Sequence, residues 1–186
     1  KRQVLFNAAI FLKDGNLEDT YFKQILPNYK EFDEKRYFER GNANKIISVN
    51  GVSIGLSICE DIWSEIFVSK IIEDGAELIL NLSASPFTSS KKETREEMLN
   101  GYYKKYFCPI IYVNQIGGQD ELVFDGSSLV VGVEKKVLKT LKSFKTDSLS
   151  FEYEHSKFII ENSENELEKS KLDDIYDALV LGTRDY

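Results

Sequence analysis

Gly51-Val-Ser-Ile-Gly-Leu-Ser-Ile-Cys59-Glu60-Asp61-Ile62-Trp63 is the stretch that decides the fold. From Val52 to Ile58, apolar residues stand at every second position with small residues between them, which predicts a buried strand. A helical pattern follows from Ser64, so Cys59 falls at a strand-to-helix turn, at the sheet edge where ligands usually bind in α/β folds. The start of that helix would stabilise a thiolate, which is the nucleophilic form of cysteine.

The two cysteines have different interpretations. A cysteine outside disulfides is often a small, inert core residue, but Cys59 at a strand end beside two carboxylates also fits a reactive thiol. Cys108, at the start of another apolar strand, fits the core role better. Their number and spacing predict no disulfide framework and no zinc site, and the one histidine, His155, lies far from both in the sequence. We therefore expect no metal in this chain and no cysteine–histidine dyad.

Composition narrows the class of protein. The 186 residues suit one domain of ordinary size, and 42% hydrophobic content indicates a globular chain. With 24 basic and 31 acidic residues the net charge is −7, and the basic residues form no stripe. Nucleic-acid binding is therefore not expected, because it needs such a stripe. No apolar run approaches the roughly 20 residues of a membrane span, and no signal peptide opens the sequence, so we expect a cytoplasmic protein without membrane contact.

Hydrophobic periodicity and turn signals predict alternating strands and helices. Strands are expected at 4–12, 16–22, 46–49, 52–58, 77–82, 109–115 and 124–133, and helices at 64–74, 91–107 and 171–186. Asp14-Gly15 and Asn50-Gly51 are two-residue hairpin signals. The order strand–helix–strand–helix–strand from 52 to 115 predicts an α/β fold with crossover helices. The charged segment 30–44 reads as a loop, and the acidic segment 143–170 as a loop or linker.

Spacing also predicts which face of each helix is buried. For the three helices in turn, the expected core residues are Ile66, Phe67 and Ile71; Met98, Tyr102 and Tyr106; and Leu172, Ile175, Tyr176, Leu179 and Val180. The last helix is amphipathic and runs to the end of the sequence without a cap. We therefore expect that more protein follows it and, because a strand pattern begins within a few residues of Lys1, that some precedes it.

Four segments together carry a family resemblance: Tyr21–Tyr29, Ser57–Trp63, Asn81–Phe87 and Tyr112–Ser127. They resemble the glutaminase domain of glutamine-dependent NAD synthetases, in the nitrilase (carbon–nitrogen hydrolase) superfamily. The Gly-Gln-Asp-Glu-Leu-Val-Phe-Asp-Gly part of the last segment favours NAD synthetases over the wider superfamily. The resemblance runs from the first strand to Tyr186 and implies a nitrilase-like αββα sandwich, N-terminally truncated.

The resemblance also implies the site residues. Cys59 matches the nucleophile and Lys23 the lysine of a Glu-Lys-Cys triad. Four residues fall at substrate-contacting positions: Tyr29, Glu60, Ser85 and Lys91. The match of Lys91 is the loosest, because the family has Arg or Lys there. The triad glutamate of the family precedes the first strand, and neither Glu18 nor Glu60 stands in its motif, so the sequence offers no counterpart.

The implied activity is hydrolysis of the glutamine amide, which supplies ammonia for the ATP-dependent conversion of deamido-NAD to NAD. The implied organisation is a glutaminase domain at 1–142, a linker at 143–170 and a helix at 171–186 leading to an absent synthetase domain. That domain would use ATP and Mg²⁺, whereas the glutaminase part would need no cofactor. The superfamily also implies a homo-oligomer. Two alternatives stay open: another amidase or nitrilase, and a chain that binds a ligand or partner without catalysis.

Overall fold

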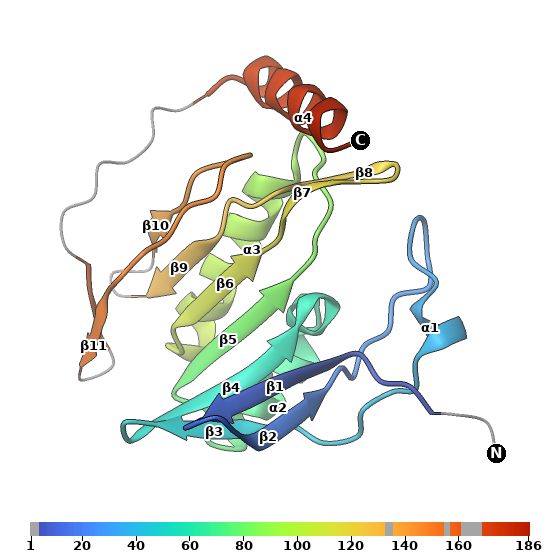
Figure 1. The fold of residues 1–186 in the computed structure, drawn as a ribbon. Coiled ribbons are helices and arrows are strands. Elements are labelled where there is room, and N and C mark those ends of the chain that lie inside the picture. The colour runs from blue at the N-terminus through green and yellow to red at the C-terminus, as the bar shows by residue number, and fades with distance from the viewer. Residues whose placement is uncertain (1–3, 133–135, 155–156, 161–168) are drawn as a thin grey trace. The chain divides into compact units, whose positions relative to one another are not determined.

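The structure is a computed structural model that describes residues 4–132, 136–154, 157–160 and 169–186 (Figure 1). The chain divides into two compact units, residues 1–82 and 83–186. The prediction of a domain boundary near 142 is not tested by this division. None of the described helices is long and apolar enough to cross a membrane.

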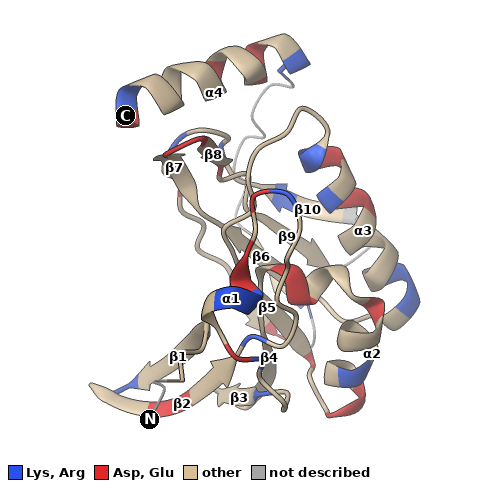
Figure 2. Cartoon of the chain, turned by 90° about the vertical axis from the view of Figure 1, so that its right-hand side faces the viewer, with Lys and Arg blue, Asp and Glu red and all other residues tan. Residues whose placement is uncertain are grey.

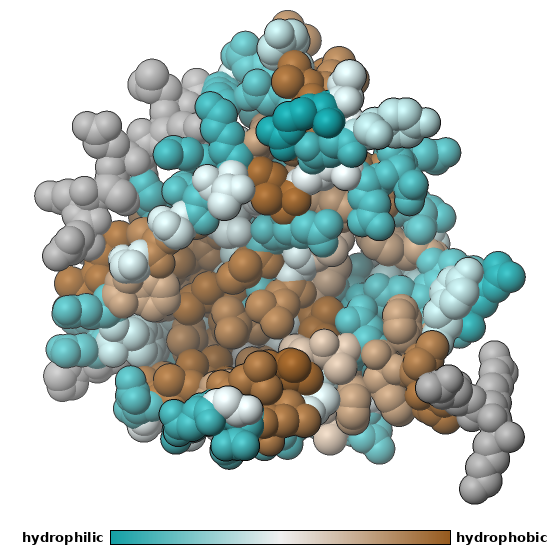
Figure 3. All heavy atoms as spheres, viewed as in Figure 1, coloured by the Kyte–Doolittle hydropathy of each residue, from teal (hydrophilic) through white to brown (hydrophobic). Residues whose placement is uncertain are grey.

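The first unit opens with an antiparallel hairpin, β1 (Ala8–Lys13) and β2 (Asn16–Phe22). The turn residues Asp14 and Gly15 both have positive φ, 50° and 79°, as the type I′ turn requires. The predicted hairpin is thus confirmed, although its first strand begins at Ala8. Figure 3 shows apolar surface along this hairpin, where Ile10, Leu12 and Leu17 are exposed, whereas Tyr21 is buried.

A second hairpin leads into the strand that ends at Cys59. β3 (Ile46–Val49) pairs antiparallel with β4 (Val52–Ile58) through the Asn50-Gly51 turn, as predicted. β4 then pairs in parallel with β5 (Leu78–Ser83), so the connection between them is a crossover. Gly55 allows the close approach of this crossover, because a Cβ there would lie 2.8 Å from Ile71.

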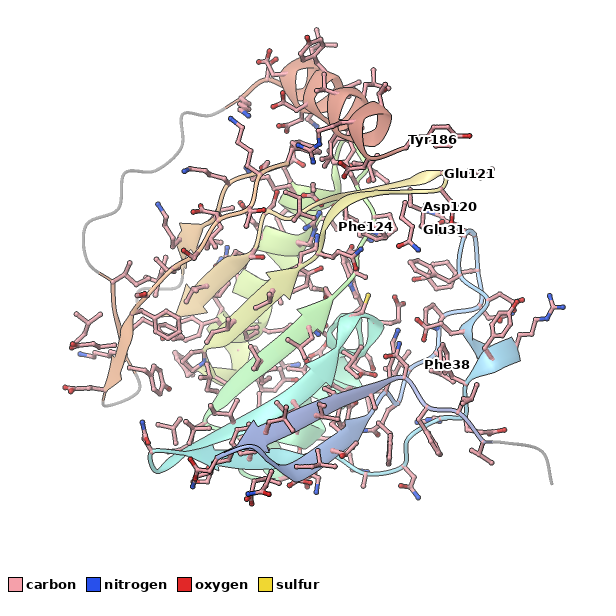
Figure 4. The ribbon with its side chains drawn as sticks, in the orientation of Figure 1. Glu31, Phe38, Asp120, Glu121, Phe124 and Tyr186 are labelled. Atoms are coloured by element: carbon pink, nitrogen blue, oxygen red, sulfur yellow. The ribbon has the colours of Figure 1, made fainter. Side chains whose placement is uncertain are left out.

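The crossover consists of a 3-10 helix, η1 (Cys59–Trp63), followed by α2 (Glu65–Glu73). Ser64 caps α2 by accepting a hydrogen bond from the Phe67 amide. Phe67 and Ile71 are buried as predicted, but Ile66 is exposed and Val68 takes its place in the core. The segment predicted as a loop at 30–44 contains one helical turn, α1 (Glu34–Tyr37). Glu31 lies in the loop before this turn and Phe38 follows it (Figure 4).

The second unit contains α3 (Lys91–Tyr106), β6 (Ile110–Asn114), β9 (Leu129–Gly132) and β10 (Lys136–Thr140). β9 pairs antiparallel with both β6 and β10, and α3 contacts β9. Basic and acidic residues alternate along the ribbon of α3 (Figure 2). The predicted core face of α3 is wrong: Met98, Tyr102 and Tyr106 are half-buried, and the buried side chains are Arg95 and Leu99.

The strand predicted at 124–133 is in fact two strands. β8 (Leu122–Asp125) turns back on β7 (Ile116–Gln119), and the chain then leaves the hairpin through 126–128 before β9 begins. Asp120 and Glu121 form the tip of this hairpin (Figure 4). A further small hairpin, β11 (Glu152–Glu154) with β12 (Lys157–Ile159), lies within the segment that composition assigned to a linker. His155 lies outside the described residues.

The helix predicted at the end of the chain is present as α4 (Lys171–Asp185), and it packs on the β7–β8 hairpin. Its packed face is not the predicted one. Ala178 and Leu181 are buried against Phe87, Ile116, Val123 and Phe144. The residues of the predicted face are exposed to solvent in this chain: Leu172, Ile175, Tyr176, Leu179 and Val180. At the end of α4, Tyr186 extends into solvent (Figure 4).

Candidate active site

Cys59 is the first residue of the 3-10 helix that follows β4, and its side chain is half-buried. Its φ is 44°, in the left-handed region that a non-glycine residue enters only at a cost of about 1–3 kcal/mol. The sharp turn lets the thiol project from the end of the strand. The helix expected to stabilise the thiolate begins only at Glu65, beyond the 3-10 helix, so its dipole does not act directly at Cys59.

Asp61 is fully buried and accepts four hydrogen bonds around this turn. Its Oδ2 accepts from the Ile58 amide at 3.0 Å and from the Tyr21 hydroxyl at 2.7 Å. Its Oδ1 accepts from the amides of Gln24 at 3.2 Å and Ile25 at 2.8 Å. Burial raises the pKa of this carboxyl, and the hydrogen bonds counteract part of that rise. One carboxylate therefore joins the turn that holds Cys59 to the chain that follows β2.

Lys23 immediately follows β2 and is almost completely buried. Its Nζ lies 2.7 Å from Oε1 of Glu34 in α1. Its backbone is held on both sides, since its amide donates to the Asn7 carbonyl and its carbonyl accepts from the Gly41 amide. Gly41 has no room for a side chain, because a Cβ there would lie 2.1 Å from the Phe22 carbonyl oxygen. The ammonium group of Lys23 is thus fixed in place by its surroundings.

Tyr29 and Glu60, two of the predicted substrate contacts, meet in the first unit, and their role in binding substrate stays a prediction. The Tyr29 hydroxyl donates to Oε1 of Glu60 at 2.7 Å. Partial burial raises the pKa of Tyr29, and the hydrogen bond to Glu60 and electrostatic interactions with Glu60 and Cys59 raise it further. These interactions act at short range, so Tyr29, Glu60 and Cys59 lie in one neighbourhood.

Asn81, on β5 beside β4, gives the Cys59 turn a second anchor. Its Nδ2 donates to the Ser57 hydroxyl at 2.9 Å and to the Cys59 carbonyl at 3.5 Å. Asn81 is fully buried, so these bonds are shielded from water. The Ile58 amide, before Cys59, and the Cys59 carbonyl are therefore both held by side chains from within the same unit.

Ser85 and Lys91, the other two predicted substrate contacts, belong to the second unit. Ser85 is buried, and its peptide is clamped by Asn114: the Ser85 amide donates to Oδ1, and Nδ2 donates to the Ser85 carbonyl. Asn114 also donates to Asp125, which forms a buried ion pair with Arg95 at 2.7 Å. Lys91 is the half-buried first residue of α3. The role of both residues in binding substrate stays a prediction.

Sequence reasoning missed three residues of this site: Glu34, Asp61 and Asn81. Glu34 stands in a charged run that composition assigns to a solvated loop, and Asp61 was quoted only as one of two acidic neighbours of the cysteine. Both residues have aromatic or apolar neighbours in the sequence, which could have indicated burial. Such neighbours can pack into the core, and a charged residue between them is then buried beside a partner. Asn81 stood in a quoted motif, with no role assigned.

The fold and the site define a class of protein. The family model described as carbon–nitrogen hydrolase matches residues 1–152. The chain therefore belongs to the carbon–nitrogen hydrolase family and has the fold of the nitrilase superfamily, as predicted. A carbon–nitrogen hydrolase from Helicobacter pylori G27 shares this fold, with a TM-score of 0.71 and 26% identity over 78% of this chain and 57% of that one.

Within that family the chain is similar to glutamine-dependent NAD synthetases, as predicted. It is 36% identical to the enzyme of that name from Acinetobacter baylyi, over 97% of this chain and 34% of that protein. The solved NAD synthetase of Acinetobacter baumannii, in complex with ADP, superimposes with a TM-score of 0.90 at 37% identity, again over 97% and 34%. The chain thus spans about a third of the length of these relatives.

A solved amidase from Nesterenkonia sp. AN1 adds a chemical observation on a more distant relative. It matches 69% of this chain and 47% of its own, with a TM-score of 0.60 and 27% identity. The structure is of a glutamate-to-glutamine mutant of that amidase, in which the acetamide moiety of fluoroacetamide is added covalently at the active-site cysteine.

Proposed function

We propose that this chain is the glutamine-hydrolysing part of a glutamine-dependent NAD synthetase, with Cys59 as the nucleophile. One observation carries the proposal. The turn that bears Cys59 and the chain that bears Lys23 meet at the Asp61 carboxylate. This carboxylate accepts hydrogen bonds from the amides of Gln24 and Ile25, which lie 37 and 36 positions before Asp61 in the sequence. A nucleophile and a buried cation are thereby brought to one end of the fold. The similarity to NAD synthetases along 97% of the chain favours glutamine as the amide.

In this proposal the Cys59 thiolate attacks the side-chain amide carbon of glutamine. The carbonyl oxygen becomes an oxyanion, and the Lys23 ammonium stabilises it. Collapse of the tetrahedral intermediate forms a thioester and releases ammonia after protonation of the amine. Water then hydrolyses the thioester to glutamate and regenerates the thiol. A covalent route suits an amide, because a thiolate is a strong nucleophile toward a poor electrophile. Covalent labelling of the amidase cysteine is consistent with this chemistry.

Glu34 holds the Lys23 side chain in place through a buried ion pair. Its Oε1 accepts from Nζ at 2.7 Å, and a buried ammonium is stable only beside an opposite charge. Its Oε2 is buried and has no hydrogen-bond partner in the described part of the chain, so it can accept one more hydrogen bond. The family pattern also includes a glutamate as general base, which takes the thiol proton and passes it to the leaving amine.

Tyr29 and Glu60 are proposed to bind the charged end of glutamine. Their mutual hydrogen bond presents a carboxylate next to the nucleophile, where it can bind the substrate ammonium group. Ser85 and Lys91 complete the proposed contacts. The wider reaction is part of the same proposal: released ammonia serves an ATP- and Mg²⁺-dependent synthesis of NAD from deamido-NAD, in a cytoplasmic homo-oligomer.

The test is a pair of cysteine variants in the full-length protein. Cys59→Ala should abolish glutamine-driven NAD synthesis and leave ammonia-driven synthesis near the wild-type rate, since only amide hydrolysis uses the thiolate. Cys108→Ser should be nearly silent in both assays, because that thiol is a buried core group. Equal loss of both activities in Cys59→Ala would mean that Cys59 is structural. Hydrolysis of acetamide in preference to glutamine would indicate a different amidase.

Glu34→Gln tests the role of the buried ion pair. Loss of the counter-charge beside Lys23 should lower kcat for glutamine hydrolysis by about 10²-fold or more. Glu31→Gln, an exposed change in the same loop, is the matched control and should leave kcat unaltered. If the two variants behave alike, Glu34 has no part in the reaction.

A further inference from the structure

The buried carboxylate of Asp61 joins the turn that holds Cys59 to the chain around Lys23 by hydrogen bonds. Three of its four donors are backbone amides: Ile58, which directly precedes Cys59, and Gln24 and Ile25, which directly follow Lys23. Amides in an unstrained turn are satisfied locally, by carbonyl groups nearby in the sequence. Here the amides of Gln24 and Ile25 instead donate to a side chain more than thirty residues away in the sequence.

The arrangement has a cost, which argues that it does more than fill space. A carboxylate with no exposed surface is destabilised by burial, as the raised pKa of Asp61 reflects. No basic side chain supplies a hydrogen bond to it in the described part of the chain; neutral donors do. An apolar residue would pack in this core with less penalty. A buried carboxylate that accepts hydrogen bonds only from neutral donors restricts the positions of those donors, because the loss of any one bond leaves the buried charge less well satisfied.

Cys59 needs such a fixed support. Its φ of 44° is held against an intrinsic preference for other conformations. The amide of Ile58, on one side, is held by Asp61, and the Cys59 carbonyl, on the other, is held by Asn81. Loss of the Asp61 bond would let the turn relax and the sulfur move away from its position relative to Lys23. A displacement of 1 Å is enough to cost about 100-fold in rate.

We propose that Asp61 is a positioning residue for the glutaminase reaction: its carboxylate sets the distance between the Cys59 thiol and the Lys23 ammonium without touching substrate. The inference rests on the proposed function, because it assumes that these two groups act together. It separates the roles of two neighbouring acids, with Glu60 facing Tyr29 at the surface and Asp61 facing the backbone inside.

Asp61→Asn and Tyr21→Phe form a matched pair of variants. Whichever way the new amide is turned, its NH₂ group faces at least one of the three backbone N–H groups, so at least one backbone anchor is lost. Tyr21→Phe removes one hydrogen bond from the same carboxylate but leaves all three backbone anchors in place. The first variant therefore disturbs position, and the second disturbs only local stability.

The readouts are steady-state kinetics of glutamine hydrolysis in the full-length protein and the pH dependence of Cys59 alkylation by iodoacetamide. Asp61→Asn should lower kcat by about 100-fold while KM changes little. It should also shift the alkylation profile to higher pH, because a displaced ammonium no longer stabilises the thiolate. Tyr21→Phe should keep kcat within about threefold of wild type and keep the profile. Thermal unfolding followed by circular dichroism reports whether each variant is folded, because ammonia-driven NAD synthesis is not expected to depend on this part of the protein.

An unchanged alkylation profile and an unchanged kcat in folded Asp61→Asn would overturn the inference and leave the proposed function intact. Equal effects of the two variants on kcat would also overturn it, since the carboxylate would then be a general structural element. Asp61→Glu gives a second measurement for a poorly folding Asn variant: the charge is kept, the oxygens move by one methylene, and kcat should again fall. Retained glutamine hydrolysis in Cys59→Ala, by contrast, would defeat the proposed function itself.

Discussion

Asp125→Asn should destabilise the chain strongly, because it removes the charge from a fully buried ion pair. Arg95 Nη2 lies 2.7 Å from Oδ1 and 2.9 Å from Oδ2 of Asp125, and both side chains are at most 2% exposed. Removing one partner of such a pair leaves a buried, uncompensated charge and costs roughly 3–5 kcal/mol. Asn114, which holds the Ser85 peptide, also donates to Asp125.

The expected loss corresponds to a fall in Tm of roughly 6–20 °C for a chain of this size. Urea unfolding followed by circular dichroism measures it, with an unchanged slope as evidence that only stability has changed. Asp33→Asn is the control: its partner Arg36 is 3.7 Å away and both side chains are more than half exposed, so the loss should stay below about 1 kcal/mol. If the two variants lose the same free energy of unfolding, the Arg95–Asp125 pair contributes no more than a surface contact, and the reasoning is refuted.

Other substitutions probe the packing around both units. Gly41→Ala should lower the proposed glutaminase activity by displacing Lys23, because the new Cβ would collide with the Phe22 carbonyl oxygen. Thermal unfolding measures the loss of stability and steady-state kinetics the loss of activity. An unaltered kcat would contradict this account. Gly101→Ala, in an exposed part of α3 with open space around it, should instead stabilise the chain by roughly 0.5–1 kcal/mol in the same unfolding assay, and a destabilised variant would be unexpected. Leu181→Ala should cost about 2–5 kcal/mol, because this side chain is buried between α4 and the β7–β8 hairpin, and a neutral result would contradict that packing.

Local chemistry made most of the strands and turns predictable. Asn50-Gly51 must form a tight turn, because few other residue pairs accept two positive φ angles in succession. The alternating pattern from Val52 to Ile58 likewise identified β4 with its observed bounds. These signals depend only on neighbours in the sequence, so they survive whatever the rest of the chain does.

The buried face of α4 was not predictable in this way. Its strongest apolar pattern, which includes Leu172 and Leu179, is exposed, and the packed side carries Ala178 and Gly182. The small residues are favoured there because the β7–β8 hairpin approaches closely: a Cβ on Gly118 would lie 3.0 Å from the Gly182 Cα. Which side of a helix is buried depends on the shape of its partner, and hydrophobicity alone does not report that shape.

The site shows the same division between local and distant causes. Cys59 and Lys23 were found because each stands at the end of a strand within a recognisable motif. The partner that fixes each of them was not found, since Glu34 and Asp61 resemble solvated charges until the fold places a donor beside them. The sequence Cys59-Glu60-Asp61 puts two acids in one short turn with opposite surroundings, one at the surface against Tyr29 and one completely buried. A 3-10 helix rotates successive side chains by about 120°, so neighbours must face different ways. In the proposed reaction, the nucleophile therefore takes its substrate contact from Glu60 and its support from Asp61, and neither acid can replace the other.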